Sequence, residues 1–287
     1  LNTDEVLPLL GAKDGVSHLP LALANEDDEV LVPNPGYPAY LGPTLMIGAH
    51  PIFYDLLPEN NFKISLEYLE SKITEKTKYA WVNFPSNPTG QVVTLNDLEE
   101  IIAFSQRHSL PIIYDNAYSE ITFDGFIAPS ILQVMGAKET AVEIGSFSKT
   151  FSFAGFRMGW IVGNKRIIEA LAKVKSQLDS GLSLPLQHLG AFALSHYDES
   201  WHRQTITSYK KRRDIISTKL KSLGLTFSLP KGALYIWARI PDSAKNSENF
   251  CMELLKRKQV LFIPGTAFGN NGERFVRVSI CVNINTI

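Results

Sequence analysis

One lysine of this chain, Lys149, stands among residues that can hold an aldehyde bearing a phosphate group. Ser146 and Ser148 come just before it, and Arg157 follows eight residues later. A lysine amine forms a Schiff base with an aldehyde, while hydroxyl groups and an arginine fork bind a phosphate dianion. The pattern therefore predicts an aldehyde cofactor attached to Lys149, with its phosphate on the two serines and Arg157.

Two other interpretations fit the lysine taken alone. A Ser-x-x-Lys sequence also occurs in serine acyl enzymes, and a polar turn with one exposed lysine needs no function at all. Arg157 and Gly159, at their spacing from Lys149, favour the cofactor interpretation over both.

Asp115 is the second candidate, because it ends the apolar run Pro111–Asp115. A carboxylate at the end of a buried strand is costly without a partner. A protonated ring nitrogen would be such a partner, and the pairing would keep a pyridine ring cationic and hence a better electron sink. Tyr118, three residues later, can hydrogen-bond a phenolate oxygen on the same ring. The alternative for Asp115 is the N-cap of a following helix.

Three turns carry further candidates. Asn87 lies in the turn Asn83–Gly90, and Tyr37 lies in the proline-rich loop Pro33–Pro38, where its ring can stack on an aromatic cofactor. Gly11–Gly15, which includes Ala12 and Lys13, precedes an apolar helix and can present backbone N–H groups to a phosphate. Each of the three also fits an ordinary turn or a half-buried tyrosine.

Arg277 stands inside the apolar strand predicted over Phe275–Ser279. An arginine in such a strand usually has an anionic partner. A substrate carboxylate held by both guanidinium nitrogens is one candidate, and an internal salt bridge is the other.

Short apolar runs alternate with amphipathic segments over the first two thirds of the chain. This alternation predicts an α/β fold with a largely parallel sheet and a ligand at the carboxyl ends of its strands. We expect a helix capped by Asn96 and another over Lys165–Leu178. The predicted strands are Glu29–Pro33, Tyr79–Phe84, Leu110–Tyr114, Ala141–Gly145 and Met158–Gly163.

The last third predicts a smaller α+β domain. A long charged helix runs from Glu199 to Leu223 and ends at Gly224. Strands over Ala233–Arg239, Val260–Ile263 and Phe275–Ser279 follow, with a helix around Ser247–Lys258. We therefore expect a large cofactor-binding domain over 1–197 and a small C-terminal domain over 198–287. Because Glu5–Leu10 is an element already under way, we also expect that an N-terminal segment is missing.

Composition excludes several classes of partner. The 287 residues carry a formal net charge of -1 with no long run of one sign, which gives no basis for binding nucleic acid or an anionic membrane. No apolar stretch is long enough to span a bilayer. Cys251 and Cys281 have no metal-ligand spacing and are expected as two buried thiols in a reducing cytoplasm rather than as a disulfide.

Taken in order along the chain, these residues resemble the fold-type-I aminotransferases of class I and II, which use pyridoxal 5′-phosphate. The resemblance runs from about Val6 to Val282. It implies that Lys149 is the Schiff-base lysine, Asp115 the partner of the ring nitrogen, and Arg277 the clamp for the substrate α-carboxylate. It also implies phosphate contacts from Ser146, Ser148, Arg157, Ala12 and Lys13, ring-oxygen contacts from Tyr118 and Asn87, and stacking by Tyr37. Lys13, Tyr37 and Asn87 are expected to contact the substrate as well.

Within that superfamily the stretches Val6–Pro20, Asp124–Lys138 and Asp179–Gly181 resemble the LL-diaminopimelate aminotransferases. The resemblance implies transfer between LL-diaminopimelate and 2-oxoglutarate in lysine biosynthesis, by a homodimer. The chain departs from that family in having alanine at position 12 in place of serine, and in the segment that follows Lys149. In that family an N-terminal segment also supplies substrate contacts and a contact to the phosphate of the neighbouring subunit.

The same groups serve other reactions at the substrate Cα. An aspartate- or alanine-type aminotransferase and a C–S β-lyase both remain compatible with Lys149, Asp115 and Arg277. A non-enzymatic regulator domain that binds the cofactor is the alternative from another class, which the balanced charge and the complete set of catalytic groups disfavour.

Overall fold

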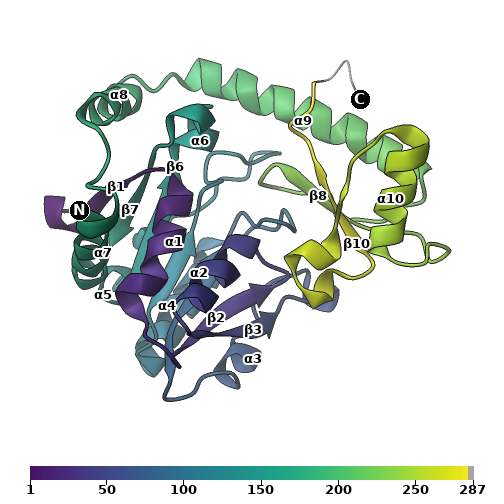
Figure 1. The fold of residues 1–287 in the computed structure, drawn as a ribbon. Coiled ribbons are helices and arrows are strands. Elements are labelled where there is room, and N and C mark those ends of the chain that lie inside the picture. The colour runs from purple at the N-terminus through teal and green to yellow at the C-terminus, as the bar shows by residue number, and fades with distance from the viewer. Residues whose placement is uncertain (284–287) are drawn as a thin grey trace.

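The computed structural model describes residues 1–283, in which a seven-stranded sheet is the largest feature (Figure 1). In spatial order its strands are β1 (Val6–Leu9), β7 (Gly159–Gly163), β6 (Ala141–Ser146), β5 (Ile112–Asp115), β4 (Thr77–Asn83), β2 (Glu29–Asn34) and β3 (His50–Asp55). The five strands from β6 to β3 run parallel, whereas β7 and β1 are antiparallel to their neighbours. The largely parallel sheet predicted from the sequence is confirmed.

Helices cover both faces of this sheet, which explains why its central strands are apolar along their whole length. In β4, Trp81 belongs to one core with α1 (Ala12–Leu23) and α7 (Lys165–Leu178). Its neighbour Val82 points to the opposite core, with α4 (Leu95–His108). The shorter helices are α2 (Leu41–Met46), α3 (Leu66–Glu70), α5 (Ala137–Thr140) and α6 (Phe147–Thr150).

Helix α4 begins two residues earlier than the sequence predicted. The N-cap is Thr94, whose hydroxyl accepts a hydrogen bond from the Asp97 N–H while the Asp97 carboxylate accepts one from the Thr94 N–H. This reciprocal capping box satisfies two helix donors at once. Asn96, the predicted cap, instead donates a side-chain hydrogen bond to Glu100 within the helix, so that prediction was wrong.

The register of the sheet brings the predicted site residues to one edge. Asn83 at the end of β4 pairs with Asp115 at the end of β5. Ser146 at the end of β6 pairs with Gly159, the first residue of the antiparallel β7, and Gly159 also pairs with Leu9, the last residue of β1. Strand β7 runs opposite to the parallel strands, whereas β1, antiparallel to β7, runs in their direction. The loop before β7 and the turn after β1 therefore both lie at the carboxyl edge of the parallel strands.

A second, three-stranded sheet has the order β8 (Tyr235–Arg239), β10 (Phe275–Ser279) and β9 (Ile263–Pro264), with α10 (Ser247–Lys258) against it. Helix α8 (Leu184–Ser195) and then α9 (Glu199–Ser222) run along the top of Figure 1, and α9 leads to this small sheet. Of the strand predicted over Val260–Ile263, only Ile263 is in β9. The predicted small domain extends to residue 287, and its last four residues lie outside the described part.

The two sheets meet through the loop after β2 and the end of β3. The Gly36 N–H donates to the Phe268 carbonyl at 2.9 Å, and the Asn271 amide donates to Asp55 at 2.7 Å. The carboxyl edge of the large sheet and one face of the small sheet thus enclose a space between them. Within the described residues, no helix combines the length and the apolar character needed to cross a membrane.

Candidate active site

A cavity of about 340 Å³ lies at the carboxyl edge of the large sheet, and it contains every residue that the sequence predicted for the site. They come from loops and elements spread over most of the chain. The predicted residues that line it are Ala12, Lys13, Tyr37, Asn87, Asp115, Tyr118, Ser146, Ser148, Lys149, Arg157 and Arg277. The fold therefore assembles the whole predicted constellation in one place.

One end of the cavity is suited to a phosphate group. Gly11 precedes α1 with φ +84°, and a Cβ atom there would lie 2.5 Å from Nη2 of Arg157, so only glycine fits beside the guanidinium. Arg157 is exposed, and within the described residues it has no carboxylate partner; its Nη1 donates to the Ala154 carbonyl at 2.9 Å. A guanidinium beside the first turn of a helix, whose N–H groups lack intrahelical partners, attracts a dianion.

Asp115 lies buried on the floor of the cavity. Its Oδ2 accepts a 2.6 Å hydrogen bond from the Tyr40 hydroxyl, and its Oδ1 accepts one from the Ala117 N–H at 3.2 Å. Burial raises the pKa of the Asp115 carboxyl, and this effect outweighs the two hydrogen bonds, which lower it. No cation pairs with it among the described residues, so a protonated ring nitrogen would supply what the site lacks. The residues that follow, 117–120, form a turn rather than a helix, and the N-cap interpretation was wrong.

Lys149 lies on the short helix α6, half-buried, with no ion-pair partner in the part of the chain that the structure describes. Its Nζ is 5.7 Å from the centroid of the Tyr118 ring. The Tyr118 hydroxyl is 3.1 Å from that of Tyr235. Burial is the main cause that raises the pKa of Tyr118 well above its usual range. A lysine held without a carboxylate keeps its amine available to a ligand.

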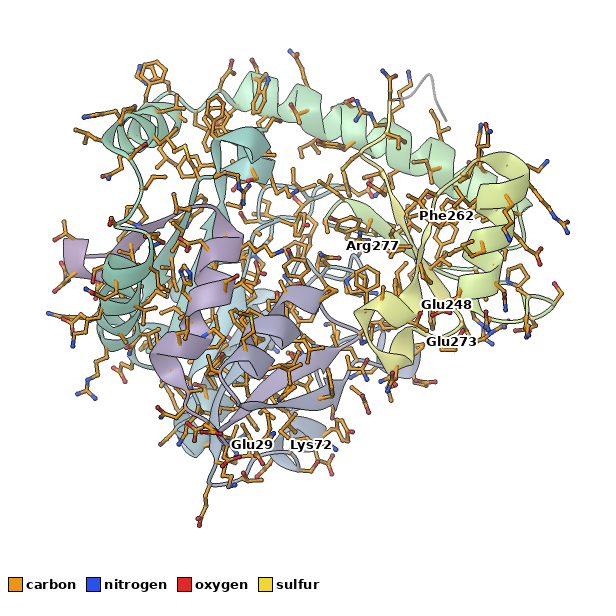
Figure 2. All side chains as sticks on the ribbon, in the orientation of Figure 1. Glu29, Lys72, Glu248, Phe262, Glu273 and Arg277 are labelled. Carbon is orange, nitrogen blue, oxygen red and sulfur yellow. The ribbon has the colours of Figure 1, made fainter. Side chains whose placement is uncertain are left out.

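Arg277 projects from β10 into the cavity, on the side of the small sheet that faces the large one (Figure 2). Its Nη1 donates to the Asn87 side-chain oxygen at 2.8 Å, and its guanidinium lies over the rings of Tyr235 at 4.2 Å and Phe268 at 4.6 Å. Among the described residues no carboxylate forms an ion pair with it, so the internal salt bridge considered from the sequence was wrong. The guanidinium is positioned by neutral groups and keeps its charge for an anionic ligand.

Three further residues that sequence reasoning did not single out support the site. Tyr40 is fully buried, stacks on Trp81 at 4.5 Å and holds Asp115. Asn83 donates to the Asp115 carbonyl at 2.8 Å and accepts the Asn87 N–H at 2.8 Å. The third is Tyr235, between Tyr118 and Arg277. Their positions follow from contacts between strands, which no local pattern reports.

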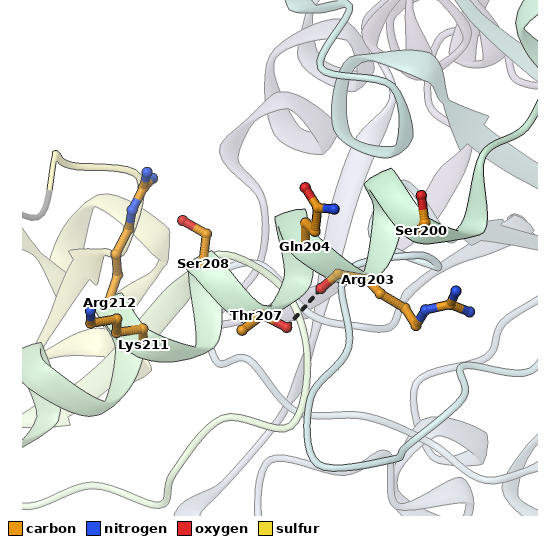
Figure 3. A pocket seen from close by; sticks show the side chains of 7 residues that line it. All are labelled: Ser200, Arg203, Gln204, Thr207, Ser208, Lys211 and Arg212. Carbon is orange, nitrogen blue, oxygen red and sulfur yellow. Dashed lines mark hydrogen bonds between the residues drawn. The ribbon is translucent and has the colours of Figure 1, made fainter.

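A larger hollow, of about 600 Å³, lies along one side of α9 (Figure 3). Its lining comes from this single helix and is exposed or half-exposed: Ser200, Arg203, Gln204, Thr207, Ser208, Lys211 and Arg212. No buried polar group converges on it, so size alone does not make it the candidate site.

The cavity at the sheet edge fits pyridoxal 5′-phosphate by the chemistry of its donors. It offers a lysine amine for the aldehyde, a buried carboxylate that lacks a cation for the ring nitrogen, and an arginine beside a helix N-terminus for the phosphate. Tyr37, half-buried in the lining, presents an aromatic ring. These are the groups that this cofactor requires of its protein.

Comparison with known proteins agrees with the geometry. The profile of the family described as Aminotransferase class I and II matches residues 1–287. The LL-diaminopimelate aminotransferase of Dehalococcoides mccartyi strain CBDB1 is 40% identical over 98% of this chain and 72% of its own length. The enzyme of the same name from Halothermothrix orenii is 38% identical over 97% of this chain and 71% of its own.

Solved structures show the same fold. The apo form of BacF from Bacillus subtilis superposes with a TM-score of 0.93 at 36% identity, over 98% of this chain and 71% of that one. A double mutant of the aspartate aminotransferase from Thermus thermophilus gives a TM-score of 0.92 at 26% identity, over 99% of this chain and 73% of that one. Fold, site chemistry and family profile thus agree: the chain belongs to the class I and II aminotransferases, transaminases of fold type I that depend on pyridoxal 5′-phosphate.

Proposed function

We propose that this transaminase moves the amino group of LL-diaminopimelate to 2-oxoglutarate, a reaction of lysine biosynthesis. One observation carries the choice of substrate class: after the cofactor and the α-carboxylate have taken their partners, one cation of the cavity is left. Arg157, Lys149 and Arg277 have those tasks, and Lys13 remains in the lining. A spare ammonium favours a substrate with a second carboxylate, as both proposed substrates have. The names of the relatives support the same choice.

In the proposed site the cofactor would be held at four points. Arg157, Ser146, Ser148 and the first turn of α1 would hold its phosphate, and the Lys149 amine would bond its aldehyde. Asp115 would pair with its ring nitrogen, and Tyr118 and Asn87 would hydrogen-bond its phenolic oxygen. Tyr37 would offer its ring for stacking. When bound, the cofactor supplies an electron-poor ring that stabilises negative charge at the substrate Cα.

Lys149 then carries the proton chemistry. Its Nζ on α6 would be a free amine whenever it is not bonded to the cofactor. It would take the proton from the substrate Cα as a general base and hold that proton for return as a general acid. Asp115, buried and held by Tyr40, keeps the ring nitrogen protonated throughout.

Arg277 orients the substrate for this transfer. Its remaining guanidinium donors bind the α-carboxylate in a bidentate manner, which fixes the Cα–H bond relative to Lys149. Lys13 binds the distal carboxylate. Both are cations that the structure leaves without a carboxylate partner among the described residues, so they do not have to break an existing ion pair.

Single-turnover measurements test the substrate. We expect LL-diaminopimelate and glutamate each to convert bound cofactor to its amine form, and 2-oxoglutarate to reverse the change. Conversion by alanine or an aromatic amino acid, without conversion by LL-diaminopimelate, would contradict the proposed substrate while leaving the family intact. Release of pyruvate and ammonia from a β-thio amino acid without any oxo acid would indicate elimination instead.

Substitution of Asp115 should separate stability from catalysis. The folded-state pKa of Asp115 is raised above the ordinary unfolded value of about 3.9. The folded chain therefore binds the proton more tightly, and its stability falls as pH rises through the window between the two values. Asp115→Asn removes the charge, so the cofactor-free variant should melt higher than the parent at pH 7 and equally at pH 3.

The same variant should lose activity. Without a carboxylate the ring nitrogen is not held protonated, and we expect kcat to fall by about 10²-fold or more. Glu143→Gln is the control, because Glu143 is a buried carboxylate with a raised pKa that does not line the cavity. Full activity in Asp115→Asn would contradict the assigned role, and a lower melting temperature at pH 7 would contradict the linkage argument.

We propose further that the enzyme is a cytoplasmic homodimer with a large domain over 1–197 and a small one over 198–287. Helix α8 supports the dimer, because it is apolar yet mostly exposed. Only Gly190 and Ala193 of its residues are buried, while Leu184 and Phe192 are 63% and 60% exposed. Exposed apolar surface of this kind marks an interface. Both cysteines are free thiols, which supports a reducing compartment. Cys251 is buried as expected, whereas Cys281 is exposed, so the expectation of a buried thiol was wrong there.

Charge placed on α8 tests the dimer. We expect the double variant Leu184→Glu and Phe192→Glu to reduce the mass measured by light scattering from twice to once the 32.0 kDa of the chain. Two buried carboxylates without partners would cost more than the interface returns. Met135→Glu is the control, since Met135 is 93% exposed but lies outside α8. A parent that is monomeric at micromolar concentration would contradict the dimer directly.

A further inference from the structure

A buried cluster of charges lies behind the first turn of α1, outside the set of residues used above. It consists of Asp14 and His18 of α1, Lys175 of α7, and Asp179 just after α7. The side chains of Lys175 and Asp14 are 3% and 5% exposed. Burying such charges is costly, and an ion pair of this kind does not by itself add stability. Its presence therefore calls for an explanation beyond holding α1 against α7.

Lys175 is the resident cation of the cluster. Its ammonium group donates to the carboxylates of both Asp14 and Asp179, the latter at 2.6 Å. His18 Nδ1 lies 2.7 Å from the other Asp14 oxygen. The two carboxylates and the imidazole lie close enough together to bind a metal ion, but the ammonium already occupies their common partner position. The lysine ammonium thus takes the place of a metal ion there.

Asp14 is also the only residue of the cluster that reaches the turn of the proposed phosphate site. Its Oδ2 accepts the N–H of Leu10 at 2.8 Å, and the next residue is Gly11, which lies against the Arg157 guanidinium. Gly11 has no side chain with which to cap α1. Asp14 therefore fixes the turn whose following residues, Ala12 and Lys13, line the cavity.

This arrangement creates an electrostatic conflict that Lys175 resolves. The N-terminus of a helix acts as about half a positive charge and attracts a phosphate. A carboxylate in the first turn offsets that charge and repels an incoming dianion. Asp14 is such a carboxylate, and its side chain is too buried for water to screen it well. The ammonium of Lys175 neutralises it from behind.

We propose that Lys175 is a positioning residue for the cofactor phosphate, acting through Asp14. Asp14 holds the turn, and Lys175 removes the repulsion that Asp14 would exert on the dianion. The inference rests on the proposed phosphate site at Arg157 and α1. It concerns affinity for the phosphate group and leaves the chemistry at Lys149 unchanged.

The test compares pyridoxal 5′-phosphate with pyridoxal, which lacks the phosphate, in titrations of the cofactor-free protein at pH 8. At this pH the phosphate is a dianion. Lys175→Met should weaken binding of pyridoxal 5′-phosphate about tenfold and change pyridoxal binding less than about twofold. An equal loss for both ligands, or no loss for either, would overturn the inference.

Removal of the Asp14 charge keeps the test valid if Lys175→Met folds poorly. Asn at position 14 can still accept the Leu10 N–H but carries no charge. Asp14→Asn should therefore bind pyridoxal 5′-phosphate at least as tightly as the parent, and adding Asp14→Asn to Lys175→Met should restore the lost affinity. If the cluster were merely structural, Asp14→Asn and the double variant would both bind pyridoxal 5′-phosphate more weakly than the parent. That result would overturn the inference.

Two controls distinguish a wrong role for Lys175 from a wrong phosphate site. Arg213→Met removes an equally buried cation, whose partners Asp124 and Asp214 lie outside the cavity. The preference for the phosphorylated ligand should not change. Arg157→Met should abolish most of the preference for the phosphorylated ligand. If Arg157→Met leaves the preference for the phosphorylated ligand intact, the proposed phosphate site is wrong. If Arg157→Met abolishes that preference but the Lys175 variants leave it intact, the phosphate site stands and only the role of Lys175 is wrong.

Discussion

Replacing Lys149 by alanine is expected to lower transaminase turnover by about 10⁴-fold or more, because the variant loses the attachment point and the proton carrier together. The cofactor should still bind through its phosphate and ring nitrogen. Initial rates with saturating amino donor and 2-oxoglutarate, measured after adding excess pyridoxal 5′-phosphate, give the comparison.

Lys13→Ala is the matched control, because Lys13 is the other lysine in the lining of the cavity. It should raise KM for substrates with a second carboxylate and leave kcat for alanine nearly unchanged. Reduction of the parent with borohydride should fix the cofactor to the peptide that contains Lys149. Label on Lys13, or wild-type turnover in Lys149→Ala, would reverse the assignment.

Replacing Arg277 by methionine is the change with the next largest effect. The guanidinium is held over two aromatic rings and by Asn87 and has no carboxylate partner among the described residues. Removing the partner of a desolvated substrate carboxylate should lower kcat/KM by about 10²-fold or more. Arg277→Lys should recover only part of this loss, because an ammonium group does not provide the bidentate fork.

An amine substrate that lacks the α-carboxylate separates binding from collapse of the site. It reacts slowly with the parent, and Arg277→Met should not slow it further. Arg239→Met is the control, since Arg239 lies on the neighbouring strand β8, pairs with Asp242 and does not line the cavity. Equal losses for substrates with and without the α-carboxylate would show that Arg277 acts on the fold and not on the substrate.

The chemistry of the site could be predicted from the sequence because its groups stand in short, separate motifs at the ends of apolar runs. Asp115 and Ser146 end strands and Asn87 follows one, and parallel strands bring such ends together. The positions of Gly11 and Arg157 are different. Arg157 reaches this edge because β7 runs antiparallel to β6, and Gly11 reaches it because β1, antiparallel to β7, runs in the direction of the parallel strands. Apolar patterning does not encode these strand directions.

Residues that act through another side chain could not be predicted. Tyr40 follows Pro38 in an unremarkable loop, and its role depends on the approach of that loop to the end of β5. The pattern around Tyr235 indicates only an aromatic residue within a strand. The helical pattern predicts that Lys175 lies on the surface of an amphipathic helix. It is buried instead, because its ammonium group binds two carboxylates from separate segments.

Some elements were also missed or misplaced, for local reasons. Helix α8 is apolar on all sides, so it lacks the periodicity that marks an amphipathic helix. Strand β3, at the edge of the large sheet, is only partly buried and includes Pro51, which weakens a strand signal. Thr94 and Asn96 are both good caps, and the reciprocal bond with Asp97 decides for Thr94.

The absorbance spectrum of the purified protein with pyridoxal 5′-phosphate, recorded before and after addition of LL-diaminopimelate and then of glutamate, tests the central claim most directly. We predict a visible band for the cofactor joined to Lys149 and its conversion to a near-ultraviolet band with either amino acid. In Lys149→Ala the first band should be absent until an amine is added. A parent protein that shows no such band with added pyridoxal 5′-phosphate, or a band that no amino acid changes, would contradict the account.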